Sequence, residues 1–140
     1  MPASRRQLTP AHYETLAAFR HALRRFLHFS QEAATRAGIP PQQHQALLAL
    51  KGFSPAGRLS VGALAERLHL RHHSTVGLVD RLARRGWVRR SPAREDRRRV
   101  EVQLTARGEA LIARLSAAHL AELRTLGPEL RRLLEFVERR

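Results

Sequence analysis

The sequence concentrates its positive charge in one stretch, the thirty residues from Arg71 to Val100. This stretch contains ten arginines and three acidic residues, a net charge of +7, which is half of the +14 carried by all 140 residues. Guanidinium groups pair with phosphates and with the edges of guanine bases. Because so dense a cluster is typical of a surface that binds a polyanion, the chemistry predicted here is recognition of nucleic acid.

Seven positions in the first half of this stretch are candidates for direct contact with DNA. On a helix, they would supply donors to base edges and phosphates, a valine for a thymine methyl group, and a glycine that lets the helix approach the DNA backbone closely. These positions are Arg71, His72, His73, Ser74, Val76, Gly77 and Arg81. The alternative is an ordinary solvated helix face.

The second half contains the segment SPAREDRRR, which is too polar to be buried and predicts a protruding loop. Such a loop can lie along the DNA backbone and insert an arginine into the minor groove. We expect Asp96 to orient a neighbouring guanidinium through a bidentate pair. The candidate DNA-contacting residues of the loop are Arg94, Arg97, Arg98 and Arg99. The alternative is a solvated charged turn.

Two short helices joined by a tight turn would position these candidates. Ser60 can cap a helix that runs to about Leu68, and a second helix is predicted from about Arg71 to Arg85. Residues at helical spacing give the second helix a buried stripe of Thr75, Leu78, Val79 and Leu82. Gly86 stops this helix, and the alternation that follows predicts a hairpin. The pattern is that of a helix-turn-helix followed by a wing.

Longer helices with apolar faces flank this unit. One is expected over residues 10–36 and a shorter one over residues 41–51. After the hairpin, a helix is expected over residues 106–126, and Gly127-Pro128 should break it before a final helix. These leucine-rich helices exceed what a domain of this size can hide internally, which predicts that they pair with a second copy across a two-fold axis.

Several classes of protein are excluded by what the sequence lacks. The absence of cysteine excludes a disulfide scaffold, a thiolate zinc site and a thiol redox switch. His72 and His73 are adjacent, so on a helix they point about 100° apart and cannot easily share a metal ion. There is no GxSxG, P-loop or HExxH motif, so we expect neither an enzyme nor a cofactor. Without a signal peptide or an apolar stretch of spanning length, the protein is expected to be cytoplasmic.

Four short motifs within residues 74–111 identify a known pattern. They are Leu78-Val79-Asp80-Arg81-Leu82, Gly86-Trp87-Val88-Arg89-Arg90, Asp96-Arg97-Arg98 and Leu104-Thr105-x-x-Gly108. Together with their spacing, they resemble the MarR-type (multiple antibiotic resistance) winged-helix transcription regulators. The resemblance implies a mainly α fold with a small β-wing, as one MarR-like domain over residues 1–140. Its lobe would be 41–105, and its dimerisation helices would be 10–37 and 106–140.

The resemblance also implies a function. Members of the family bind double-stranded DNA as homodimers, so we expect a sequence-specific regulator, a repressor that binds a pseudo-palindromic operator. Arg98 matches the family's wing arginine and Asp96 its wing acid. Many members release DNA when a small, often aromatic, effector binds between the dimer helices and the lobe. The wall of that site would here be His21, Arg24, His28, His44 and Leu48.

Two departures from the family pattern and two competing functions stay open at this point. Oxidation-sensing members use a cysteine that this chain lacks, and His72-His73-Ser74-Thr75 replaces the usual start of the recognition helix, which changes the operator that is read. One competing function is a non-specific architectural DNA-binding protein. The other is an RNA-binding winged helix whose arginines follow an A-form backbone.

Overall fold

A computed structural model describes residues 7–93, 95–96 and 98–139 of the chain. Within these residues, five helices and three short strands follow the order expected for a mainly α protein with a small β-wing. No helix among them is both long and apolar enough to cross a membrane. The elements are α1 (Pro10–Arg36), α2 (Pro41–Gly52), β1 (Arg58–Ser60), α3 (Val61–Leu68), α4 (His72–Arg84), β2 (Val88–Pro92), β3 (Val100–Leu104) and α5 (Ala106–Glu138).

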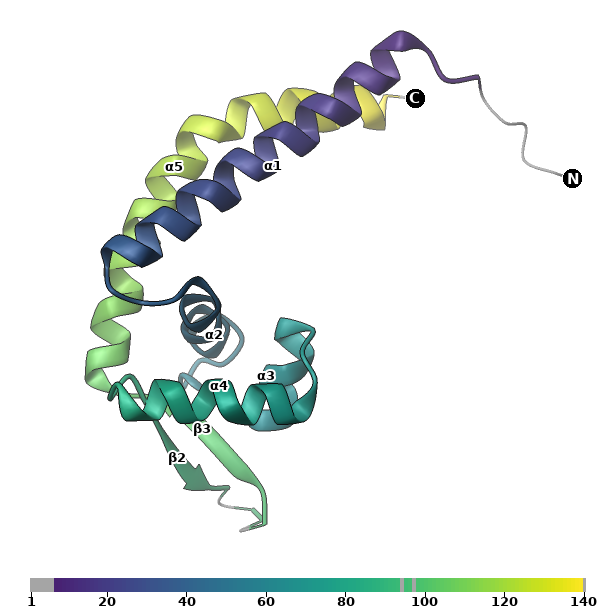
Figure 1. Cartoon of the computed structure of the whole chain (residues 1–140). Helices are drawn as coiled ribbons and strands as arrows, with labels where there is room; N and C mark the ends of the chain where they lie inside the picture. The colour runs from purple at the N-terminus through teal and green to yellow at the C-terminus, as the bar shows by residue number, and fades with distance from the viewer. Residues whose placement is uncertain (1–6, 94, 97, 140) are drawn as a thin grey trace, which may run out of the picture.

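The elements form an arm and a lobe (Figure 1). The arm consists of α1 and α5, which pack along each other, with the start of α1 and the end of α5 at its far end. The lobe consists of α2, α3, α4 and the three strands, and α5 passes from the lobe into the arm. The hydrophobic core lies mainly in the lobe, where Leu47, Leu64, Leu82 and Val102 are fully buried.

The helix-turn-helix forms as its sequence predicts. The Ser60 hydroxyl accepts a hydrogen bond from the Ala63 amide at 3.1 Å, which caps the start of α3. His69 ends α3 in a left-handed conformation, with φ of 54°, and α4 begins at His72. All four residues of the predicted stripe on α4 are buried: Thr75, Leu78, Val79 and Leu82. The opposite face of α4 therefore points outward.

The three strands form an antiparallel sheet in the order β1-β3-β2, and β2 and β3 are the two strands of the wing. The base of the wing is held by Thr105. Its hydroxyl donates to the Gly86 carbonyl at 2.7 Å and accepts from the Gly108 amide at 3.1 Å, where it caps α5. Gly86 has φ of 76°, so a glycine is favoured at this turn between α4 and the wing.

The expected break at Gly127-Pro128 is wrong, because α5 continues through both residues to Glu138. A proline inside a helix removes one amide donor, and packing against a neighbouring helix can offset that loss. Here α1 supplies the packing: Leu126 is buried, and Arg25 of α1 pairs with Glu129 just beyond the proline at 3.6 Å. The two long helices of the arm are thus continuous.

Candidate nucleic-acid interface

The predicted contact residues of α4 lie on one outward face, opposite the buried stripe. Arg71, which precedes the helix, and five residues of α4 are exposed, while Gly77 is half-buried among them. A Cβ added at Gly77 would meet only the guanidinium of Arg81, at 3.5 Å. The fold itself therefore leaves room for a side chain at Gly77. The five exposed residues are His72, His73, Ser74, Val76 and Arg81.

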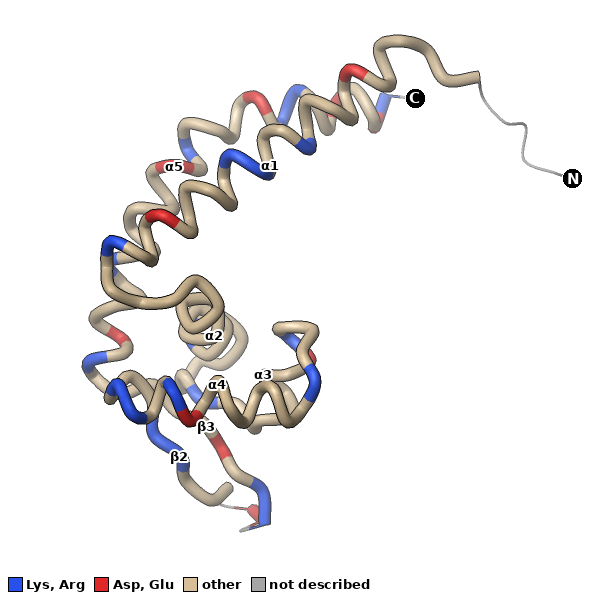
Figure 2. Tube along the Cα trace, in the orientation of Figure 1, with Lys and Arg blue, Asp and Glu red and all other residues tan. Residues whose placement is uncertain are grey.

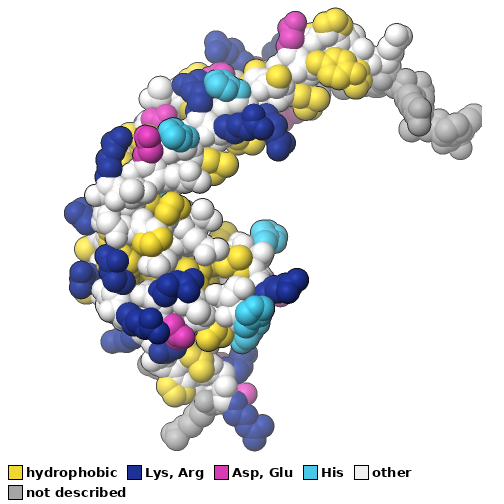
Figure 3. Space-filling model, viewed as in Figure 1, with side chains coloured by type: hydrophobic (Ala, Val, Ile, Leu, Met, Phe, Trp, Pro, Cys, Tyr) yellow, Lys and Arg dark blue, Asp and Glu magenta, His cyan; other side chains and the backbone are white. Residues whose placement is uncertain are grey.

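A groove of about 400 Å³ separates α4 from the wing. It brings His72 and Val76 of the helix together with Arg98 and Arg99 of the wing, which sequence reasoning had placed in two separate segments. In the space-filling view, histidine and arginine side chains gather where α3 meets α4 and around the wing (Figure 3). The residues of the groove that sequence reasoning missed are Ser60, Val61, Gly62, Val79, Arg90 and Val100.

Most of these missed residues carry no local signal that points to a groove. Ser60, Val61 and Gly62 start a helix of ordinary composition and reach the groove only because α3 packs against α4. Arg90 belongs to the family-like motif at the start of the wing, so its position was visible in the sequence, but its partner was not. The partner is Asp80 of α4, with which Arg90 forms an ion pair.

The arginines of the lobe fall into two groups. Some are engaged within the chain: Arg58 pairs with Glu101 at 3.6 Å, and Arg89 donates to the Gln103 side-chain oxygen at 3.2 Å. Others are exposed and, within the described residues, enter no ion pair; they include Arg71, Arg81, Arg84, Arg98 and Arg99. Figure 2 shows the basic positions of the lobe distributed over α4 and the wing. The second group is available to an external anion such as a phosphate.

At the tip of the wing, Asp96 bonds to the backbone of the turn. Its carboxylate accepts a hydrogen bond from the backbone amide of Arg98 at 3.0 Å, and its carbonyl accepts from the Arg99 amide at 3.0 Å. Asp96 therefore shapes the backbone of the turn. Its predicted pairing with a neighbouring guanidinium stays a prediction. The predicted contacts Arg94 and Arg97 lie outside the described residues.

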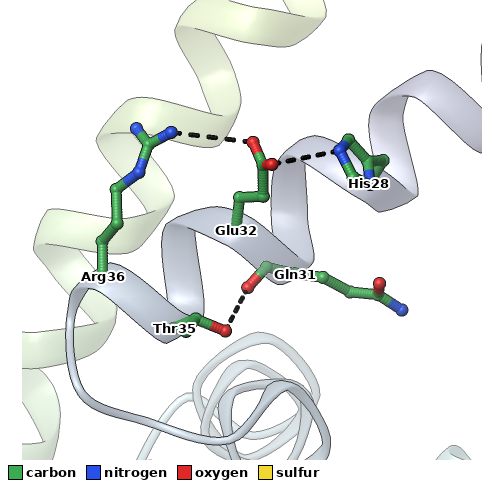
Figure 4. Close-up of polar contacts among 5 residues, drawn as sticks. All are labelled: His28, Gln31, Glu32, Thr35 and Arg36. Atoms are coloured by element: carbon green, nitrogen blue, oxygen red, sulfur yellow. Dashed lines mark hydrogen bonds and ion pairs between the residues drawn. The ribbon is translucent and has the colours of Figure 1, made fainter.

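Three predicted effector-site residues lie exposed on α1: His21, Arg24 and His28. Figure 4 shows Glu32 between His28, at 3.1 Å, and Arg36, at 3.6 Å, along one side of the helix. The neighbouring Thr35 hydroxyl donates to the Gln31 carbonyl of the preceding turn at 2.9 Å. The His28 side chain therefore interacts with Glu32 of its own helix.

The other two effector-site residues lie on α2. Leu48 is 46% exposed, whereas His44 is buried, with its ring centre 4.9 Å from that of His119 on α5. Burial lowers the pKa of His44 from 6.5 to about 4, and the neighbouring His119 adds to the decrease. His119 is itself held by the Leu115 carbonyl at 2.6 Å and the Ser30 hydroxyl at 2.8 Å. The structure thus places His44 in a junction of α1, α2 and α5, whereas His21 and Arg24 are exposed on α1.

Comparisons with known proteins agree with this geometry. The MarR family profile matches residues 37–99. The HTH-type transcriptional regulator YfiV of Bacillus subtilis (strain 168) is 41% identical over 71 residues, which is 50% of this chain and 44% of YfiV. The chain thus matches less than half the length of that relative.

Solved structures match over nearly the whole chain. AbsC, a MarR family transcriptional regulator from Streptomyces coelicolor, superposes with a TM-score of 0.75 at 20% identity, over 95% of this chain and 91% of AbsC. Sco3205, another MarR family regulator from Streptomyces coelicolor, was solved in complex with DNA. It superposes with a TM-score of 0.73 at 25% identity, over 98% of this chain and 89% of Sco3205. Residues 37–99 thus match the MarR family of transcription regulators, and the chain shares the winged helix-turn-helix fold of the solved members of that family.

Proposed function

We propose that the chain is a sequence-specific DNA-binding repressor that acts as a homodimer on a pseudo-palindromic operator. The observation that carries the proposal is the groove between α4 and the wing. Its lining presents the exposed Arg90, Arg98 and Arg99 of the wing, beside a face of α4 that is not needed for the core. A helix of this kind fits the major groove of B-form DNA, and the wing then reaches the backbone and the adjacent minor groove.

The contacts divide by role. Ser74, Val76 and the histidines at the start of α4 would read base edges, while the arginines would pair with phosphates and orient the lobe. Arg98, at the tip of the wing, would enter the minor groove, with Asp96 shaping the turn that presents it. Phosphate contacts release counterions, so binding should weaken steeply as salt is raised.

The arm supports the proposed dimer. Only Ala22 and Ala34 of α1 are buried, although the helix has 27 residues. Large apolar side chains lie exposed along both helices, and hydrophobic groups are visible on the arm in Figure 3. They are Tyr13, Leu16, Leu23 and Leu27 of α1 and Leu120, Leu123, Leu134 and Val137 of α5. Two helices cannot bury such faces between themselves, whereas a second arm related by a two-fold axis can.

The dimer is tested by placing a charge in the arm. Leu16→Glu should convert a dimer of 15.9 kDa chains into monomers in analytical ultracentrifugation and abolish tight operator binding. Phe53→Glu is the matched control, because Phe53 is also an exposed apolar residue, 53% against 61% for Leu16, but lies beyond α2 in the lobe. A wild-type protein that remains monomeric at micromolar concentration would refute the dimer.

DNA recognition is tested by selecting a binding sequence from random duplexes with the wild-type protein. A repressor of this kind should select two inverted half-sites whose centres are about one helical turn, roughly 34–36 Å, apart. Equal affinity for every duplex would instead indicate an architectural protein. Tighter binding to duplex RNA than to duplex DNA at equal salt would indicate the RNA-binding alternative.

The proposal includes release by a small aromatic effector bound between the arm and the lobe. Its support is the position of His44 and Leu48 on α2, which lies beneath the arm. Benzoate and hydroxybenzoates are suitable probes. They should raise the melting temperature and weaken operator binding, since a ligand of the folded protein stabilises it by mass action. If none of them changes either quantity, the effector is removed from the proposal.

A further inference from the structure

Arg85 makes two contacts that join separate parts of the lobe. It is the residue that ends α4, and its guanidinium donates to the Gly38 carbonyl at 3.0 Å, 47 residues earlier in the chain. The guanidinium carbon also lies 4.4 Å from the centre of the Trp87 ring, over its face. A single side chain thus connects the end of α4 with the turn between α1 and α2.

Both partners of Arg85 are themselves fixed. Gly38 has φ of 79° and ends the first helix of the arm, and the next residue, Ile39, is buried in the core. Trp87 is 4% exposed, and its carbonyl accepts from the Thr105 amide at 3.1 Å, at the start of α5. Arg85 therefore contacts a place where α4, the α1–α2 turn and the start of α5 come together.

We infer that Arg85 is a positioning residue for DNA recognition, which holds α4 at a defined orientation relative to the arm. The inference rests on the proposed function, because the orientation of α4 matters for DNA recognition only if α4 binds DNA. In a dimer, the arms set where the two lobes lie. The angle between α4 and its own arm then decides whether both recognition helices fit successive major grooves at once. In Figure 1, the end of α4 and the α1–α2 connection lie on the same side of the lobe.

The two contacts explain why an arginine is used. A planar guanidinium can stack on an indole ring through its face while its edge donates to a carbonyl. A lysine carries the same charge on a compact ammonium group and cannot do both in this geometry. The change Arg85→Lys therefore removes the connection without removing a positive charge, so long-range attraction to DNA is kept.

The experiment compares Arg85→Lys with Arg84→Lys. Arg84 is the matched control, because it is the neighbouring exposed arginine at the end of the same helix and forms no ion pair within the described residues. Affinities for the selected operator and for an unrelated duplex are measured over a range of salt. Trp87 is the only tryptophan of the chain, so its fluorescence reports the contact directly.

For Arg85→Lys, we expect a changed Trp87 emission and a ratio of operator to unrelated-duplex affinity that falls about tenfold, which is the effect of one good base contact. The salt dependence should be unchanged, and Arg84→Lys should match the wild type. The inference is overturned if the ratio of operator affinity to unrelated-duplex affinity stays the same, as it would if both affinities fell equally. If Arg85→Lys does not fold, Arg85→Gln is measured in the same way.

Failure of the proposed function gives a different result. In that case, the wild-type protein itself binds the two duplexes equally, whatever stands at position 85. Hydrogen exchange of the backbone amides around Gly38 and Trp87 then tests the connection alone. Faster exchange there in Arg85→Lys, but not in Arg84→Lys, supports a connection between α4 and the arm, and equal exchange refutes it.

Discussion

Asp80 of α4 and Arg90 of β2 form an ion pair that joins the recognition helix to the wing. The side chains of Asp80 and Arg90 are 36% and 47% exposed, and Arg90 also lines the groove between α4 and the wing. A pair so accessible to water contributes little to stability, about 1 kcal/mol at most. Its main effect is on the charge of the surface that we propose binds DNA, because the carboxylate is neutralised by its neighbour.

A double-mutant cycle measures that effect. Arg90→Ala should weaken operator binding by about 1–2 kcal/mol, since it removes a cation and exposes the Asp80 carboxylate to the phosphates. Adding Asp80→Asn should recover part of the loss. In the control cycle, Arg71→Ala and Asp80→Asn should be additive, because about 13 Å of helix separates them. Fluorescence anisotropy with a labelled operator gives the four affinities, and additivity in the first cycle would contradict this account.

Arg98→Ala tests the wing. The variant should bind the operator more weakly and with a shallower dependence on salt. The slope of log K against log salt should fall by about 1, as expected when one cation near the phosphates is lost. Its melting temperature should stay that of the wild type, because Arg98 is exposed and its backbone, not its side chain, bonds to Asp96. Arg131→Ala, an exposed arginine of the arm, is the control and should change neither quantity. An unaltered affinity for Arg98→Ala at moderate salt would remove the wing from the mechanism.

Gly108 is required by the packing of α5 against the base of the wing. A Cβ at this position would overlap the Trp87 carbonyl oxygen, a backbone atom that cannot move aside alone. Gly108→Ala should therefore lower the free energy of unfolding by on the order of 3 kcal/mol. Gly62, also in the first turn of a helix, has no atom within 4 Å of its Cβ position, so Gly62→Ala should be neutral or stabilising by up to about 1 kcal/mol. Urea denaturation measures the free energy of unfolding of both variants. Similar values would show that the backbone around Gly108 moves to accommodate the added methyl group.

His44 makes stability depend on pH. Because its pKa in the folded chain is about 4 against 6.5, the unfolded chain binds more protons between these values. The contribution of His44 to the free energy of unfolding is fully present above pH 6.5. It falls by on the order of 2 kcal/mol as the pH is lowered toward 4. Urea denaturation at several pH values should give a flatter profile for His44→Gln, whereas His72→Gln, at an exposed position, should keep the wild-type slope. Parallel profiles for His44→Gln and the wild type would show that another group is responsible.

Much of the fold follows from local patterns in the sequence. The caps at Ser60 and Thr105 and the buried stripe of α4 are encoded within a few residues, so periodicity and side-chain chemistry predict them. The cluster of arginines around α4 and the wing is likewise visible in the sequence, since it occupies one continuous stretch. These features determine that the chain carries a helix-turn-helix with a basic wing.

The tertiary structure decided what depends on the relative placement of distant elements. Pro128 does not end α5, because α1 packs against α5 both before and after the proline. His44 is buried because α5 brings His119 against it. The contact of Arg85 with Gly38 and the pairing of Arg90 with Asp80 likewise join residues of different elements. The physical reason is that a local pattern specifies the geometry of its own segment, whereas contacts between segments depend on how the whole core packs.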